Sequence, residues 1–290
     1  MIMEAALCPL VEAMRKGLGK DPLAVVRAAR DIALGLEFLH QKEMPHLALH
    51  PNNVLLKGRR DTSDDVAMVL KHARKEGNAL HFQLTDHGGG IARAASRAKG
   101  SRYAAPELLC GYAGVEWESF DITLEKKCDA WSYGSVLLEM LTGNAPWSEL
   151  TEAELADKAK RGAPPPLPDE LADDAELLPK AREFLAVDPG ARPHFDKKLG
   201  ADLDLLLLKA AVKAPSAADF KSTVKESIQK MKMKMLIEAE MRKDADAYER
   251  AWEACEREVP SWVVANLKAD CGDLQKYFTP PRKEDVRQPV

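Results

Sequence analysis

One stretch of this sequence contains histidines, which could exchange protons, and also an alanine, which cannot. The stretch is HLALHPNNVLL, from His46 to Leu56. His50 has an imidazole, whose ordinary pKa of about 6.5 leaves it mostly neutral at about pH 7. Ala48, two residues earlier, has no group that can accept a proton. The stretch therefore offers at most a weak acid-base group beside a position that is chemically inert.

Periodic patterns place this stretch between a helix and a strand. Residues 21–41 carry apolar side chains at helical spacing, with Asp21 as the N-cap and Pro22 in the first turn. The segment NVLLKG that ends the stretch is a short apolar strand, and LHFQLTD alternates as a second strand. The charged residues 59–77 between them read as an inserted loop. We therefore expect a small β-hairpin beside a mainly helical body.

The rest of the chain reads as helical. The segment DAWSYGSVLLEML, starting at Asp129, is apolar nearly all round and predicts a buried helix. Thr151 and Glu154 have the spacing of a capping box. Residues 216–259 contain no proline or glycine, and apolar side chains recur there in steps of three and four. This pattern predicts one long amphipathic helix or two helices end to end.

The composition excludes several classes of protein. Charged residues make up 30% of the chain and hydrophobic residues 46%, and the net charge is -4 with both signs interspersed. This balance argues against a nucleic-acid or anionic-membrane surface. The five cysteines show no pair at metal-ligand spacing. No apolar run approaches the roughly 18 residues of a membrane span, and no basic leader is present, so we expect a cytoplasmic protein, with a nuclear or organellar location as alternatives.

Five motifs, in this order, resemble the C-terminal lobe of a protein kinase. HLALHPNNVLL resembles the catalytic loop H-R-D-L-K-P-x-N-V-L-L, and LTDHGG resembles the strand and D-F-G that follow it. RYAAPELL resembles the A-P-E end of the activation segment, DAWSYGSVLLEMLTGNAPW the central helix, and LAVDPGARPHF the late D-P-x-x-R-P element. Five motifs in the family's order are far more specific than any one of them.

The resemblance implies a mainly α fold and a division of the chain. Residues 1–199 would form a protein-kinase-like C-terminal lobe with a small β-hairpin, a hinge remnant at the N-terminus and an inserted loop at about 58–79. Residues 200–278 would form a helical extension, and residues 279–290 a disordered tail. No G-x-G-x-x-G and no V-A-I-K-like strand occurs in the 290 residues, so we expect the small lobe to be absent.

The resemblance also implies that the catalytic loop is degenerate. In the family, an aspartate accepts the substrate hydroxyl proton and a lysine steadies the transferring phosphate. Here Ala48 and His50 hold those places, so no catalytic residue is intact in the loop formed by His46, Ala48 and His50. Asn53 and Asp86 match the Mg²⁺ ligands of the family and imply a weak Mg-ATP site. The alternative is that Asn53 bonds its own loop and Asp86 caps a turn.

Other matching residues imply a folded scaffold. Glu107 and Arg192 match the family's buried ion pair between the activation segment and a late helix. Asp129 matches the aspartate that binds the catalytic-loop backbone, and His46 belongs to the adjoining spine. Retaining both members of a buried pair indicates a folded lobe, because removing one member is costly.

Three functions remain open on the sequence. The favoured one is a pseudokinase-type scaffold or interaction protein without phosphoryl transfer. The second is an ATP-dependent serine/threonine kinase, truncated or residually active, and the third is a structural assembly subunit that acts through its C-terminal helix. We expect protein partners at that helix or at the exposed small-lobe face, with a homodimer as a further alternative. No nucleic acid, membrane or cofactor is expected, and Mg-ATP is the alternative cofactor.

Overall fold

The computed structural model describes residues 6–57, 66, 70, 80–86, 101–110, 121–161, 163–168 and 177–213. Contacts divide the chain into two units, one of Met1–Ala73 with Leu80–Ala210 and one of Arg74–Ala79 with Ala211–Val290. The described residues fall almost entirely in the first unit. The predicted amphipathic helix and the predicted disordered tail lie outside them, as does most of the inserted loop.

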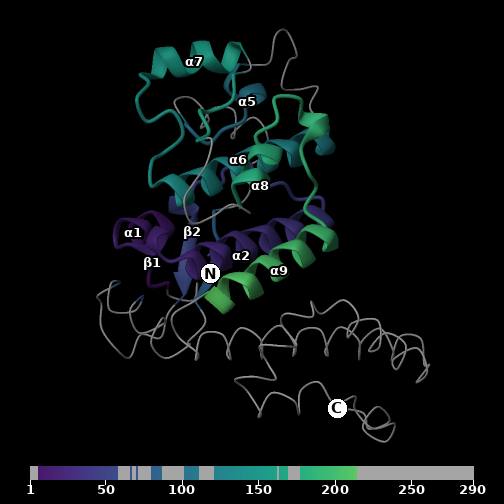
Figure 1. Ribbon diagram of the computed structural model, residues 1–290. Helices are drawn as coiled ribbons and strands as arrows, with labels where there is room; N and C mark the ends of the chain where they lie inside the picture. Colours follow the sequence, from purple (N-terminus) through teal and green to yellow (C-terminus); the bar gives the residue numbers. More distant parts are fainter. Residues whose placement is uncertain are drawn as a thin grey trace, which may run out of the picture. The chain divides into compact units, whose positions relative to one another are not determined.

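The first unit is mainly helical and contains one small sheet, which confirms the predicted fold class (Figure 1). The strands are β1 (Cys8–Pro9), β2 (Val54–Lys57) and β3 (His81–Leu84). The α-helices are α1 (Leu10–Arg15), α2 (Pro22–Gln41), α5 (Pro106–Cys110), α6 (Ile122–Thr142), α7 (Glu152–Lys160), α8 (Leu177–Phe184) and α9 (Lys197–Lys213). Short 3-10 turns are η1 (Leu18–Lys20), η2 (Pro51–Asn53) and η5 (Pro189–Ala191).

The sheet contains the predicted hairpin, formed by β2 and β3, and an additional strand, β1. Its order is β1-β2-β3, and both pairs are antiparallel. Val54 pairs with Leu84 in the hairpin, and Cys8 of β1 pairs with Leu56. Strand β1 has only two residues, too few for an alternating pattern to reveal it. The sequence analysis expects a hinge remnant at this place, and the structure has a short strand there.

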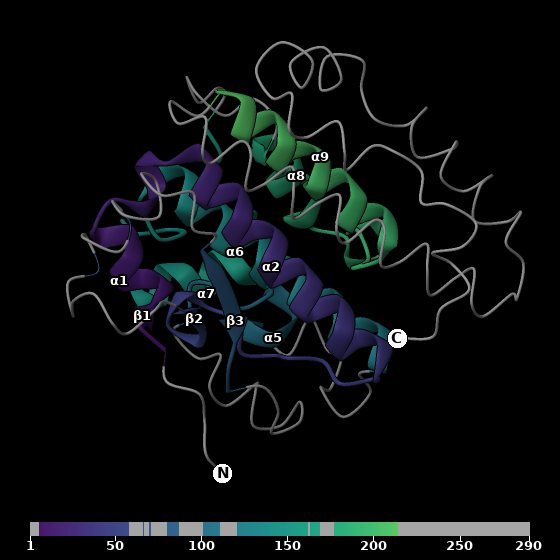
Figure 2. The same ribbon diagram turned by 90° about the horizontal axis from the view of Figure 1, so that it is seen from below.

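Helix α2 covers the outer edge of the hairpin. A carboxylate oxygen of Asp31 accepts a hydrogen bond from the backbone N–H of Phe82 over 3.0 Å. The backbone N–H groups of a strand point alternately to its two neighbours. Thr85 N donates toward β2, to the carbonyl of Asn53, so the N–H of Phe82, three residues earlier, faces away from β2. Gly35 permits the close approach, since a Cβ there would lie 2.9 Å from a methyl of Leu84. Figure 2 shows α2 running beside β3.

Helix α6 is the centre of the core, which explains why its sequence is apolar nearly all round. Helices α2 and α8 pack against it. The Tyr133 ring meets Phe184 edge to face at 4.7 Å and Phe195 at 5.2 Å between centroids. The helix begins where the Asp121 side chain accepts from Leu124 N over 2.8 Å and ends at Gly143, which is left-handed with φ 76°. Two predicted caps are confirmed: Asp21 caps α2, and Thr151 and Glu154 form a capping box at the start of α7.

Helix α9 packs on the lobe alongside α2 (Figures 1 and 2). Arg30 of α2 pairs with Asp204, and Lys180 of α8 pairs with Asp202 at 3.0 Å. The expected domain boundary between residues 199 and 200 falls inside this helix. Among the residues that the structure describes, no helix is both long and apolar enough to cross a bilayer.

Helix packing predicts opposite effects for two glycine substitutions, one in α6 and one in α9. Gly134→Ala should lower the free energy of unfolding by about 1–3 kcal/mol, because its Cβ would lie 2.8 Å from Phe184 and 2.9 Å from Leu185. Gly200→Ala in α9 should instead raise it by about 0.5–1 kcal/mol, since its Cβ meets only Leu34, at an ordinary 3.6 Å. Urea denaturation measures both, and equal effects would contradict the assigned packing.

Candidate functional site

The loop between α2 and β2 is held from the core by the carboxylate of Asp129. This side chain is fully buried on α6. Its Oδ2 accepts from His46 N over 2.7 Å, and its Oδ1 accepts from Leu47 N over 2.7 Å. Leu47 has a φ of 57°, a left-handed conformation that is uncommon for a residue with a side chain. The two hydrogen bonds hold the backbone in this conformation.

His40 makes a third hydrogen bond to the same carboxylate. Its Nε2 lies 2.8 Å from Oδ2 of Asp129, and its ring meets the edge of Phe195 at 5.3 Å. Sequence reasoning did not single out His40. A signal was present, because His40 follows the apolar Leu36 by four residues and so lies on the apolar face of the predicted helix. The structure shows that it is buried. A buried polar side chain requires a partner.

His46 joins the loop to the end of β3. Its ring is buried, with Nε2 3.1 Å from the carbonyl oxygen of Thr85. Its Nδ1 accepts from the backbone N–H of Ala48 over 3.3 Å. Because Nδ1 accepts, Nε2 carries the proton and donates to Thr85. The ring thus connects Ala48 to the residue that precedes Asp86.

Ala48 has an ordered backbone and a side chain without chemistry. Its N–H donates to His46, and its carbonyl accepts from Nδ2 of Asn53 over 2.8 Å. Asn53 N also donates to the carbonyl of His50 over 2.8 Å. Asn53 therefore bonds its own loop, as one sequence alternative proposed, and its Oδ1 is the side-chain atom that remains for a cation.

His50 is oriented by the loop. Its Nδ1 accepts from Asn52 N over 3.3 Å and caps the turn η2. Its ring lies 6.2 Å from the ring of Tyr103, tilted by 38°. The histidine thus packs on the segment before α5, with one ring nitrogen used by its own loop.

Asn53 and Asp86 lie at the same end of the antiparallel hairpin, one before β2 and the other after β3. Thr85 N donates to the carbonyl of Asn53 over 3.0 Å. Asp86 is exposed, with a left-handed φ of 57°. An amide oxygen and a carboxylate suit Mg²⁺, which usually takes few protein ligands and completes its shell with water and phosphate oxygens. No cluster of three or more metal-ligating His, Cys, Asp or Glu occurs among the described residues.

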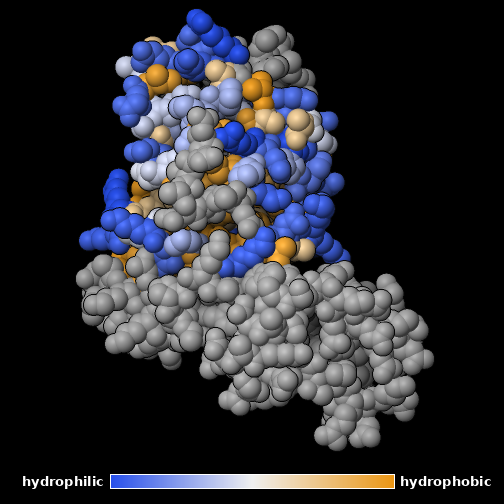
Figure 3. Space-filling view, viewed as in Figure 1, coloured by the Kyte–Doolittle hydropathy of each residue, from blue (hydrophilic) through white to orange (hydrophobic). Residues whose placement is uncertain are grey.

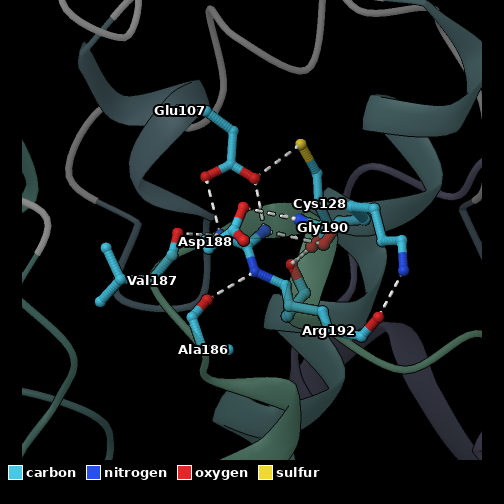
Figure 4. Close-up of polar contacts among 9 residues, drawn as sticks. Glu107, Cys128, Ala186, Val187, Asp188, Gly190 and Arg192 are labelled. Atoms are coloured by element: carbon cyan, nitrogen blue, oxygen red, sulfur yellow. Dashed lines mark hydrogen bonds and ion pairs between the residues drawn. The ribbon is translucent and has the colours of Figure 1, made fainter.

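Glu107 and Arg192 form a buried ion pair (Figure 4). Arg192 Nη2 lies 3.1 Å from Oε2 of Glu107, and Nη1 contacts Oε1. The same guanidinium donates to the carbonyls of Ala186 (2.8 Å) and Lys127 (2.9 Å) and lies 5.0 Å from the Trp131 ring centre. The pair therefore fixes α5 against α6 and the turn after α8.

A thiol completes this buried cluster. Cys128 Sγ donates to Oε1 of Glu107 over 3.5 Å. Burial raises the pKa of the Cys128 thiol, and the negative charge of Glu107 raises it further. Burial also lowers the pKa of Lys127, with the nearby Arg192 as a second cause. The thiol therefore stays protonated and acts as a donor in the cluster.

A third buried carboxylate, that of Glu139, was missed by sequence reasoning. Glu139 of α6 accepts a hydrogen bond of 2.5 Å from the hydroxyl of Tyr103. Burial raises the pKa of Glu139, while the Tyr103 hydroxyl and the charge of Arg15 oppose this shift. Burial, followed by the bond to Glu139, raises the pKa of Tyr103. The signal in the sequence was a carboxylate inside the apolar run VLLEML of the predicted buried helix, which requires a partner.

The loop, the hairpin and the buried ion pair follow one another along the chain in the same order as in one protein family. The sequence model of that family, the protein kinase domain, matches residues 1–202. This chain belongs to the protein kinase family. The match covers every strand of the described kinase lobe and the start of α9.

Curated relatives of this kinase lobe include enzymes of several kinds. It is 31% identical over 186 residues to mitogen-activated protein kinase kinase kinase 5 of Arabidopsis thaliana, covering 62% of this chain and 22% of the relative. It is 31% identical over 167 residues to serine/threonine-protein kinase ULK3 of Xenopus laevis, covering 57% of this chain and 31% of the relative. The E3 ubiquitin-protein ligase KEG of Arabidopsis thaliana is 27% identical over 232 residues, covering 74% of this chain and 14% of the relative. The chain thus spans less than a third of the length of each of these relatives.

The hydrogen bonds of Asp129 predict that the kinase loop depends on both carboxylate oxygens of this side chain as acceptors. Asp129→Asn should lower the free energy of unfolding by about 2–4 kcal/mol, because an amide group would face a backbone N–H that needs an acceptor. Asp121→Asn, at the exposed N-cap of the same helix, is the control and should change it by about 0.5 kcal/mol or less. Urea denaturation and hydrogen exchange at the amides of His46 and Leu47 measure the effect. Equal losses in both variants would contradict the assignment.

Proposed function

We propose that this kinase lobe is a pseudokinase-type scaffold that binds proteins and does not transfer phosphate. The observation that supports this most is Ala48. On the family's pattern it stands where an aspartate accepts the proton of the substrate hydroxyl. The backbone of Ala48 is held by His46 and Asn53, so the position is ordered and carries a methyl group.

The size of the expected loss supports the same proposal. A positioned general base contributes about 10²–10⁴ in rate, which corresponds to roughly 3–5 kcal/mol of activation free energy. His50 is a poor substitute for the family's lysine, because it lacks a permanent charge and its Nδ1 already accepts from Asn52. Proton acceptance and phosphate stabilisation are therefore both weakened in the loop.

We propose that the lobe requires no cofactor, and binding of Mg-ATP is the alternative. Asn53 and Asp86 could hold Mg²⁺ through Oδ1 and the carboxylate, with the remaining ligands supplied by water and phosphate oxygens. Magnesium would there neutralise phosphate charge. The Gly-rich loop and strand lysine that would hold the nucleotide have no counterpart in the 290 residues.

An ATP-dependent serine/threonine kinase is the alternative function. It is favoured by the presence of Asn53 and Asp86 and by an ordered loop around them. It is also favoured by relatives that are named as serine/threonine kinases. Ala48 opposes it, because the missing carboxylate lies in this chain itself.

A phosphate-transfer assay tests the proposal. Wild-type protein with radiolabelled ATP, Mg²⁺ and generic peptide substrates should give no transfer above background, and Ala48→Asp alone should not restore turnover, because His50 and the nucleotide-binding parts are unchanged. Asp86→Ala is the control for intrinsic activity, since transfer by a contaminating kinase would survive it. Transfer by the wild type that disappears in Asp86→Ala would refute the pseudokinase proposal.

Partner binding is assigned to the C-terminal extension and to the face where a small lobe would sit. Residues 216–259 have the amphipathic pattern of a helix that docks on another surface. This agrees with the third reading, a structural assembly subunit, because a lobe can serve as a platform for such a helix. The proposed place of action is the cytoplasm, and homodimer formation is one form that the interaction could take.

Two deletions separate the extension from the tail. Removing residues 216–290 should leave a folded lobe, since the cut lies beyond the end of α9, and should abolish self-association or partner binding. Removing only residues 279–290 is the control and should change neither property. Light scattering and pull-down measure association, and circular dichroism measures folding. Unchanged mass and intact pull-down after the longer deletion would rule out this role for the extension.

A further inference from the structure

The segment that follows α7, residues 163–168, is rich in proline. It reads APPPLP, so four of its six residues are prolines and three of them are consecutive. Each proline fixes its own φ at about −65° and restricts the residue before it to extended conformations. The structure has neither helix nor strand at these residues. The sequence therefore holds this backbone close to a polyproline II helix, which has three residues per turn and no internal hydrogen bonds.

Contacts at both ends fix this segment on the lobe. Ala163 N donates to the carbonyl of Lys158, in the last turn of α7, over 3.0 Å. At the other end, Arg182 of α8 donates to the carbonyl of Pro168 over 2.7 Å. Between these two bonds, Leu167 packs against a cluster of buried apolar side chains. A segment that is already extended and held in place loses little conformational entropy when another molecule binds it, which favours binding.

One side of the segment faces the lobe and the other faces solvent. Pro165 is buried, whereas Pro164 and Pro166 are exposed. In a helix with three residues per turn, these three prolines lie on three different ridges. Pro164 and Pro166 border an open hollow of about 470 Å³, and Figure 3 shows apolar surface among polar side chains at the end of the lobe where α7 lies. Two of the three ridges therefore present an exposed proline ring to another molecule.

The chemistry of the segment limits what can recognise it. The three consecutive prolines have no N–H, so they offer only their rings and their carbonyl oxygens. A partner cannot add here as a β-strand, since strand addition needs backbone donors as well as acceptors. Prolines along a polyproline II helix are recognised instead by grooves lined with aromatic side chains. We propose that residues 163–168 are a docking site for a protein module with such a groove, of the proline-recognising class that includes SH3 and WW domains.

An array of purified SH3 and WW domains, probed with the labelled full chain, tests the proposal. At least one module should bind with a dissociation constant of about 100 μM or tighter. Replacing both exposed prolines, Pro164→Ala together with Pro166→Ala, should weaken that binding about tenfold or more, because two ring contacts and the fixed backbone are lost. Pro22→Ala, at an exposed proline in the first turn of α2, is the matched control and should leave binding unchanged. Equal binding by the double variant and the wild type would overturn the proposal.

A synthetic peptide of residues 161–168 shows whether the fold leaves the segment accessible. It should bind the same module more weakly than the full chain does, because the free peptide must lose conformational entropy that the anchored segment has already lost. Binding of the peptide without binding of the chain would overturn the proposal, since the fold would then cover the segment. Absence of binding of the chain to every module would also overturn it, and the prolines would then only stiffen the connection between α7 and α8.

Two further measurements separate this site from other causes of lost binding. Circular dichroism checks that the variants fold, and the same two substitutions in the peptide supply the test if the variant chain does not fold. Removing residues 216–290 should leave module binding intact, because the segment lies outside the extension. Loss of binding after this deletion would place the module on the extension and overturn the assignment to residues 163–168. The docking site and the role proposed for the extension can therefore fail independently.

Discussion

The conformation of the loop between α2 and β2 depends on one buried carboxylate, that of Asp129. It is fully buried and accepts hydrogen bonds from His46 N, Leu47 N and the His40 ring. A buried charge of this kind is tolerated only when hydrogen bonds replace the water it has lost. The loop supplies those hydrogen bonds, so the core and the loop each require the other. Helix α6 is surrounded by other helices, and it therefore carries this group at a fixed place.

The contacts that hold the loop are independent of the side chain at position 48. They use the backbone N–H and carbonyl of Ala48, the His46 ring and the Asn53 amide. A methyl group at this position leaves all of them intact. These contacts therefore place no requirement on the side chain at position 48. Fold and chemistry depend on different atoms of the same loop.

The elements with strong local signals were predictable from the sequence. Helix α2 follows from its apolar period and the Asp21 cap, and α6 follows from a segment that is apolar all round. The strand β1 has two residues, and it exists because β2 lies beside it. Its place came from resemblance, since no periodic pattern fits in two residues.

The candidate site was predictable in its members and less so in its geometry. The motifs named Asp129, His46 and Asn53, but only the fold shows that the Asn53 amide donates to the Ala48 carbonyl. His40 and the pair Tyr103 and Glu139 were missed, because their partners lie 89 and 36 residues away in the chain. A single buried polar residue signals that a partner exists, and only the fold shows which one it is.

The hydrogen bond from Phe82 to Asp31 has a consequence for how this lobe meets other molecules. An edge strand with open N–H groups is a template on which further chains can stack into extended assemblies. Here a helix carboxylate occupies one of those donors, and the helix itself lies against the strand. Addition of a further strand at Phe82 would have to displace this carboxylate and the helix, which disfavours stacking at this edge.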